Sequence, residues 1–105
     1  MPKLDLHPDY LLQVKTILKQ WAPHSEVWAY GSRVNGNCHD ASDLDLVIRN
    51  PTALQKPTEH VAQLKQAFKD SELPIIVDLM DWAYLPESYR DEIKKKYVMV
   101  QNVQP

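Results

Sequence analysis

The chain has 105 residues, of which 44% are hydrophobic and 25% charged, and its formal net charge at pH 7 is −2. These values are typical of a globular protein, and the length predicts a single domain over residues 1–105 with no room for a second core. The near balance of acidic and basic residues, with the bases scattered along the chain, argues against a nucleic-acid-binding protein that works by neutralising phosphates. No apolar run is long enough to span a membrane.

The N-terminus and the cysteine content predict a compartment. The first residues lack the pattern of a signal peptide. The single cysteine, Cys38, cannot form an internal disulfide. Both features favour the cytoplasm, where thiols stay reduced.

The first third of the chain predicts a helix, a strand and a turn. Residues 9–21 carry apolar side chains at three- and four-residue spacing, the pattern of an amphipathic helix. Residues 26–30 are rich in strand formers and lead into a turn that contains both glycines of the chain, Gly31 and Gly36. Because glycine tolerates positive φ and lets the backbone approach a ligand, we expect unusual geometry there, with a brief helical turn over residues 32–35.

The remaining segments complete a small α/β domain. In chain order they are a strand (43–49), a loop with two prolines (50–57), a helix (58–70), a strand (75–81), a helix (86–96) and a short last strand or docked tail (97–100). The order helix, strand, strand, helix, strand, helix predicts a mixed sheet flanked by helices. Four aromatic residues are expected in the core: Trp21, Trp28, Phe68 and Trp82.

Two carboxylates open the strand over residues 43–49. Asp43 and Asp45 alternate with aliphatic residues, so they should share one face of the sheet while the aliphatic side chains pack on the other. Two like charges about 6–7 Å apart along a strand are unfavourable unless a cation lies between them. We therefore expect a divalent metal here; the alternative is that both are ordinary solvated residues of a half-exposed strand.

A third carboxylate lies in the strand over residues 75–81. Asp78 and Asp81 are surrounded by aliphatic residues, and burying an ionised aspartate without a partner is costly. If this strand pairs with the one that carries Asp43 and Asp45, with matching faces, Asp78 projects toward them. Three such carboxylates can hold two Mg²⁺ ions about 3.5–4 Å apart, as in phosphoryl transfer. Asp81 is three residues from Asp78 and so lies on the other face of the strand; it is interpreted as a cap at the strand end. For Asp78, the alternative is a structural role as a hydrogen-bond acceptor.

The glycine turn predicts a place for phosphates. Gly31 and Ser32 offer backbone N–H groups and a hydroxyl, and Mg²⁺ prefers phosphate and water oxygens beside one or two carboxylates, so a nucleotide is the expected co-ligand. Arg33 can reach a triphosphate, although a surface arginine after a turn fits the pattern equally well. Residues 94–96, three lysines, fall in the last turn of a helix, where cations complement the dipole; binding of phosphate or a partner is the alternative.

These motifs resemble those of the DNA polymerase β-like nucleotidyltransferase superfamily: Gly31-Ser32, ten residues, then Asp43-x-Asp45 opening a strand, and a later aspartate in a third strand. The short length and the segments Gly-Ser-Arg-Val-Asn-Gly, Ser-Asp-Leu-Asp-Leu and Val-Asp-Leu-Met-Asp-Trp are similar to its minimal nucleotidyltransferases. The resemblance covers most of the chain and implies a palm-like fold. It also implies that Asp43 and Asp45 hold both metals, that Asp78 joins the catalytic metal and helps to take the proton from the incoming hydroxyl, and that Gly31 and Ser32 seat the nucleotide phosphates.

The resemblance further implies a partner protein. Minimal nucleotidyltransferases usually pair with a helical HEPN protein, often as antitoxin and toxin, and larger relatives carry an acceptor-binding domain for which this chain has no room. The implied reaction is transfer of AMP from ATP to a tyrosine of the HEPN partner. Two alternatives stay open: a catalytically idle protein that neutralises its partner by docking, and a nucleotidyltransferase that acts on a small molecule. A phosphatase of the haloacid dehalogenase type is set aside, because here the hydrophobic strand follows the aspartates instead of preceding them.

Overall fold

The computed structural model of the protein describes residues 3–36, 39 and 41–103; Cys38, the single cysteine, lies outside these ranges. A four-stranded sheet in the order β3-β2-β1-β4 forms the centre of the structure. Its strands are β1 (Glu26–Tyr30), β2 (Leu44–Arg49), β3 (Val77–Asp81) and β4 (Val98–Gln101). β1 is antiparallel to β2 and β4, and β2 is parallel to β3, so the predicted mixed sheet is confirmed.

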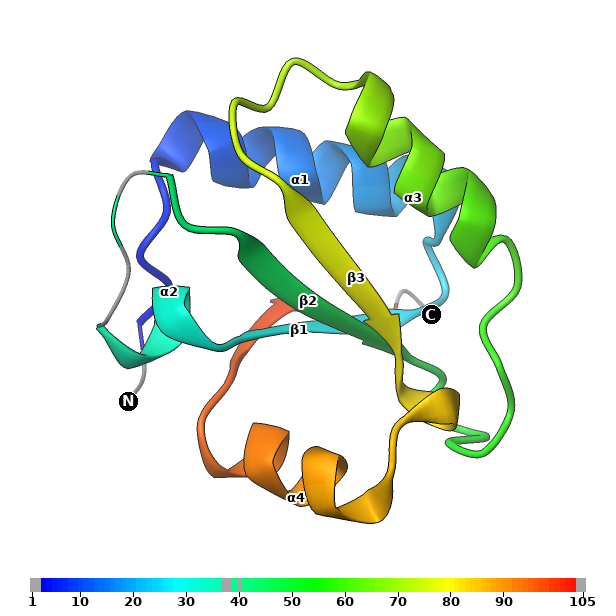
Figure 1. Ribbon diagram of the computed structural model, residues 1–105. Coiled ribbons are helices and arrows are strands. Elements are labelled where there is room, and N and C mark those ends of the chain that lie inside the picture. Colours follow the sequence, from blue (N-terminus) through cyan, green and yellow to red (C-terminus); the bar gives the residue numbers. More distant parts are fainter. Residues whose placement is uncertain (1–2, 37–38, 40, 104–105) are drawn as a thin grey trace.

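Helices cover both faces of this sheet. α1 (Pro8–Trp21) and α3 (Val61–Asp70) lie on one face and α4 (Glu87–Lys95) on the other (Figure 1). The short α2 (Ser32–Asn35) follows β1, and a 3₁₀ turn, η1 (Trp82–Tyr84), follows β3. No helix in the described part of the chain is long and apolar enough to cross a membrane.

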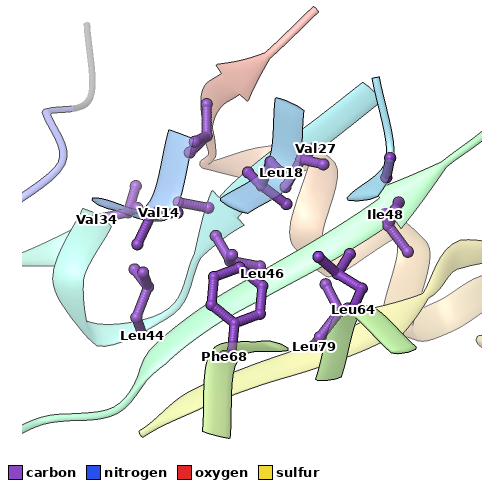
Figure 2. Packing of buried hydrophobic residues seen from close by; sticks show 13 residues of the cluster. Val14, Leu18, Val27, Val34, Leu44, Leu46, Ile48, Leu64, Phe68 and Leu79 are labelled. Carbon is purple, nitrogen blue, oxygen red and sulfur yellow. The ribbon is translucent and has the colours of Figure 1, made fainter. Parts of the chain in front are cut away.

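The face under α1 and α3 forms the larger core. Leu44, Leu46 and Ile48 of β2 are fully buried there, as the alternation with Asp43 and Asp45 predicts. Figure 2 shows these side chains between residues of α1 and α3, among them Val14, Leu18, Leu64 and Phe68. Complete burial of a leucine stabilises the folded state by roughly 1.5–3 kcal/mol. Burial of these aliphatic side chains therefore determines the orientation of β2, with the face that carries Asp45 pointing away from α1.

The opposite face is aromatic. Trp28 stacks on Tyr97 at 3.8 Å between ring centroids and meets Trp82 edge-on at 5.4 Å. The guanidinium of Arg49 lies 4.2 Å from the centre of the Trp28 ring and pairs with Glu26 at 3.1 Å. This cluster fills one half of the face; the half nearer the start of β2 carries the carboxylates.

One of the four predicted core aromatics is not buried. Trp28, Phe68 and Trp82 lie in the core as expected, but 42% of Trp21 is exposed. The row of buried residues on α1 runs through Leu18 and continues to Ala22, the residue just after the helix. Trp21 therefore lies at the margin of the apolar stripe. The prediction for Trp21 was wrong because helical spacing defines a stripe but not its exact edge.

Two elements begin two or more residues later than predicted. The strand expected from residue 75 begins at Val77, which pairs with Leu44, the first residue of β2. The helix expected from residue 58 begins at Val61. The backbone N–H of Thr58 donates to the Asp81 carboxylate at 2.9 Å, and His60 has a φ of 63°, so the helical path cannot start earlier.

Candidate functional site

The sheet register brings two of the predicted carboxylates together. β2 and β3 run parallel with Asp45 opposite Asp78. Opposite residues of neighbouring strands project from the same face of a sheet. The condition under which Asp78 projects toward Asp45, that these strands pair with matching faces, is therefore met. Asp43 lies two residues before Asp45, immediately ahead of β2.

The three carboxylates interact electrostatically. Asp45 is half-buried, whereas Asp43 and Asp78 are exposed. Burial raises the pKa of Asp45 above its ordinary value of 3.8, and the negative charges of Asp78 and then Asp43 raise it further. The site therefore favours a cation near Asp45. Asp78 was singled out as a carboxylate too costly to bury; its exposure shows that reason to be wrong, although the face on which it lies was predicted correctly.

Gly31 adjoins the Asp45 carboxylate directly. Its backbone has φ 79° and ψ −151°, a region that only glycine adopts readily. A Cβ atom at Gly31 would collide with the Oδ2 atom of Asp45, whereas one at Gly36 would meet nothing within 4 Å. The predicted unusual geometry of the turn is confirmed, and at Gly31 it makes room for the carboxylate.

Ser32 and Arg33 follow Gly31 in α2 but occupy different surroundings. Ser32 is half-buried at the start of the helix. Arg33 is only 6% exposed, so the alternative of a surface arginine is wrong. Its Nε and one terminal nitrogen donate to the Ser42 carbonyl at 3.0 and 2.9 Å, and the other donates to the Asp5 carbonyl at 2.9 Å. The guanidinium thus anchors the residue that precedes Asp43; its contact with a nucleotide stays a prediction.

A hollow opens beside Asp45 and Gly31. It has a volume of about 430 Å³. One side is lined by Tyr30, Gly31, Asn35 and Asp45, and the other by Tyr89, Glu92, Ile93 and Lys95 of α4 and by Lys96, the residue that follows α4. The sequence favoured a dipole-complementing role for the lysines at the end of α4. The structure adds that two of them reach the carboxylate site, which depends on how α4 packs and has no local signal in the sequence.

A pair of tyrosines lies across this hollow. Tyr30 of β1 is the cross-strand partner of Asp45, and its side chain is hydrogen-bonded to Tyr89. Burial raises the pKa of Tyr30, followed by the bond to Tyr89 and the nearby charges of Asp45 and Asp78. Tyr30 is therefore a neutral hydroxyl at physiological pH. Sequence analysis missed this pair, because the two residues belong to distant elements.

Asp81 belongs to a different part of the structure. Its carboxylate accepts hydrogen bonds from the backbone N–H groups of Ala83 at 3.2 Å and Thr58 at 2.9 Å. It caps η1 and holds the start of the segment before α3. The predicted role of Asp81 as a strand-end cap is confirmed.

The donor set suits magnesium. Within the described residues, no three His, Cys, Asp or Glu side chains form a ready-made metal cluster. Mg²⁺ does not require one, because it commonly binds one or two carboxylates and completes its octahedron with waters and substrate phosphates. Asp45 and Asp78 offer adjacent oxygen donors in a region of concentrated negative charge. Coordination of two Mg²⁺ ions by Asp43, Asp45 and Asp78 stays a prediction.

Comparison with known proteins places these features in a family. Residues 4–86 match the family model described as "Poly(A) RNA polymerase, mitochondrial-like, central palm domain". The chain is 46% identical over 101 residues to the "Probable protein adenylyltransferase MntA" of Haemophilus influenzae (strain ATCC 51907 / DSM 11121 / KW20 / Rd), in a match that covers 94% of this chain and 85% of that protein. The residues matched by the family model contain the glycine turn and all three carboxylates, and end just before α4.

Proposed function

The chain belongs to the palm-domain nucleotidyltransferases, in the group of minimal nucleotidyltransferases, and we propose that it transfers AMP from ATP to a hydroxyl group of a partner protein. The observation that carries the proposal is the placement of Asp45 beside Asp78 and directly against Gly31. Because Gly31 has no side chain, Asp45 lies directly against the turn whose backbone N–H groups would hold phosphates. Paired carboxylates suit Mg²⁺, which takes phosphate oxygens as further ligands. The similarity to a probable protein adenylyltransferase supports a protein as the acceptor.

The reaction forms one bond and breaks another. The acceptor oxygen attacks the α-phosphorus of ATP, the bond between that phosphorus and the bridging oxygen of the β-phosphate breaks, and pyrophosphate leaves. Asp78 helps to take the proton of the attacking hydroxyl, and Gly31 and Ser32 position the phosphates. Asp43, Asp45 and Asp78 would hold two Mg²⁺ ions, which supply Lewis-acid stabilisation of the phosphoryl oxygens when bound.

We assign the partner to the HEPN class and the acceptor to one of its tyrosines. This assignment rests on the resemblance to minimal nucleotidyltransferases. In this arrangement the chain is the antitoxin and the HEPN protein the toxin that it modifies. A stable complex between the two is expected, because the partner has to present its hydroxyl beside Asp45.

The test is intact-mass spectrometry of a HEPN protein from the same genome after incubation with the chain, ATP and Mg²⁺. We expect the HEPN protein to gain mass in units of AMP, with a tyrosine as the modified residue. The Asp45→Asn variant serves as the negative control.

Two results would contradict the proposal. An unmodified HEPN protein that nevertheless forms the complex and loses its toxicity would identify a binding protein without catalysis. Radiolabel transferred from ATP to a small molecule, with the protein unchanged, would identify a small-molecule nucleotidyltransferase.

A further inference from the structure

Three consecutive lysines lie at the C-terminal end of α4: Lys94 and Lys95 in its last turn and Lys96 just after it. They do not share one environment. Lys95 and Lys96 line the hollow that contains Asp45 and Gly31. The ammonium group of Lys94 lies 5.7 Å from the ring centre of Trp82, and Lys94 does not line that hollow. Attraction to the helix dipole accounts for cations at the end of a helix. It does not account for two of them facing the carboxylate site.

The two sides of the hollow carry charges of opposite sign. Asp45 and Gly31 lie on the sheet side, and the two lysines lie on the side of α4. The Nζ atom of Lys95 is 2.7 Å from the Oε1 atom of Glu92, which lines the same hollow. Lys95 therefore already has an anionic partner, while its side chain stays 69% exposed and accessible to another.

We propose that Lys95 and Lys96 bind the polyphosphate chain of the nucleotide, and that Glu92 competes with phosphate for Lys95. This inference rests on the proposed function, because it takes a nucleoside triphosphate as the ligand of the hollow. An ammonium group donates up to three hydrogen bonds and suits phosphate oxygens as a compact point charge. Both lysines lie beyond residues 4–86, which the family model matches, so the model does not describe this contact.

The experiment is calorimetric titration of ATP and of inorganic tripolyphosphate, each with Mg²⁺, into the wild type and single variants. Lys95→Met and Lys96→Met should each weaken the binding of both ligands by about tenfold, the loss of one exposed charge-assisted contact. Lys94→Met is the matched control, and its dissociation constants should stay within about twofold of the wild type. Lys96→Arg keeps the charge and should retain most of the affinity.

Glu92→Gln tests the competition between Glu92 and phosphate for Lys95, and it should change the affinity in the opposite direction. Removing the carboxylate frees Lys95, so ATP and tripolyphosphate should bind about two- to fivefold more tightly. Unchanged or weaker binding would overturn the role assigned to Glu92. Thermal melts of every ligand-free variant identify any change that acts through folding, because purely dipolar lysines would alter stability without altering phosphate affinity.

The lysine assignment is overturned if Lys95→Met and Lys96→Met bind tripolyphosphate like the wild type, or if Lys94→Met weakens binding as much as they do. Either result leaves the proposed function intact when the HEPN protein is still modified. Conversely, normal lysine-dependent binding with an unmodified partner would contradict the proposed function alone. A wild type that binds neither ATP nor tripolyphosphate would contradict both.

Discussion

At the scale of single residues, the site depends on the absence of a side chain. Gly31 and Gly36 bracket the same turn and both have positive φ, 79° and 85°. They differ in surroundings, because only Gly31 faces a carboxylate. Alanine variants at the two positions therefore distinguish the free-energy cost of backbone strain, which both would have, from the cost of displacing Asp45, which only Gly31→Ala would have.

We expect Gly36→Ala to lower the free energy of unfolding by about 1 kcal/mol, the cost of a left-handed alanine. Gly31→Ala should lower it by about 3 kcal/mol or more, because its backbone region is almost exclusive to glycine and the new methyl group displaces Asp45. Urea denaturation of both variants measures the difference. Equal losses would show that the carboxylate moves aside freely and that Gly31 is needed for its backbone alone.

Asp45 predicts a pH-dependent stability in metal-free protein. Its folded pKa is raised above the ordinary 3.8, by burial first and then by Asp78 and Asp43. The folded state therefore holds this proton more tightly, and stability falls as pH rises through the unfolded and then the folded pKa. At pH 8 in EDTA the full cost is present, so Asp45→Asn should melt at a higher temperature than the wild type. The advantage should disappear below pH 3.8, where the carboxyl is protonated in both states.

Thermal melts of the wild type and Asp45→Asn in EDTA, at pH 8 and below pH 3.8, provide the measurement. Asp78→Asn is a second variant for the same test. It removes the neighbouring negative charge that raises the pKa of Asp45 most, so it should also raise the melting temperature at pH 8. If both variants melt lower than the wild type in EDTA, the carboxylates do not repel one another and do not share a site.

At the scale of elements, β3 carries two aspartates with separate tasks. Asp78 is exposed beside Asp45, whereas Asp81 accepts two backbone hydrogen bonds that fix η1 and the segment before α3. The two residues are three apart in an extended strand and so lie on opposite faces.

This division predicts opposite phenotypes for two alanine variants. Asp78→Ala should reduce AMP transfer by at least ~10²-fold while changing stability by less than about 0.5 kcal/mol. Asp81→Ala should lower stability by roughly 1–3 kcal/mol, the cost of a lost cap and an unsatisfied donor, and keep most of the activity. Urea melts and transfer rates on the same preparations provide the measurement. An active Asp78→Ala variant would remove Asp78 from the mechanism.

The short α2 is held in place by Arg33. Its guanidinium joins the N-terminal segment at Asp5 to Ser42, the residue before Asp43. Arg33→Met should cost about 2–4 kcal/mol, because the carbonyls of Asp5 and Ser42 lose a charged donor whose guanidinium is buried. The variant also tests Arg33 as a nucleotide ligand: a purely structural role predicts a lower melting temperature with little change in the dissociation constant of ATP for the folded protein.

At the scale of the whole molecule, one face of the sheet holds most of the aliphatic core and the other holds the candidate functional site. The face under α1 and α3 holds the larger aliphatic core, and the face under α4 holds the aromatic cluster and the carboxylates. Ligand binding at the second face should therefore stabilise the entire domain, since both faces share the same strands.

We expect Mg²⁺ alone to raise the melting temperature only slightly, because it prefers phosphate co-ligands. Mg²⁺ with ATP should stabilise the wild type by about 2.7 kcal/mol at a ligand concentration of a hundred dissociation constants. Asp45→Asn should lose most of this gain. Differential scanning fluorimetry in EDTA, in Mg²⁺ and in Mg²⁺ with ATP measures it, and a full shift in the variant would separate Asp45 from nucleotide binding.

The sequence alone determined the features that depend on local periodicity. The helix over residues 9–21 follows from apolar spacing of three and four residues, the strand over residues 26–30 from its content of strand-forming residues, and the turn over residues 32–35 from the glycines on either side of it. The structure has all three within a residue. The alternation around Asp45 predicted which side of β2 would be buried, because a strand has only two faces. The unusual backbone geometry at Gly31 and Gly36 was expected because the chain has only two glycines, and both lie in one turn. The positive φ of His60 was not expected.

Tertiary structure decided everything that depends on contacts between distant segments. The register that sets Asp45 beside Asp78 was a condition in the sequence argument and became a fact only when β2 and β3 paired. The burial of Arg33, the exposure of Trp21 and the position of Lys95 in the hollow had no local signal. Each depends on how one element packs against another, and side-chain environment is set by that packing and not by neighbours in the chain.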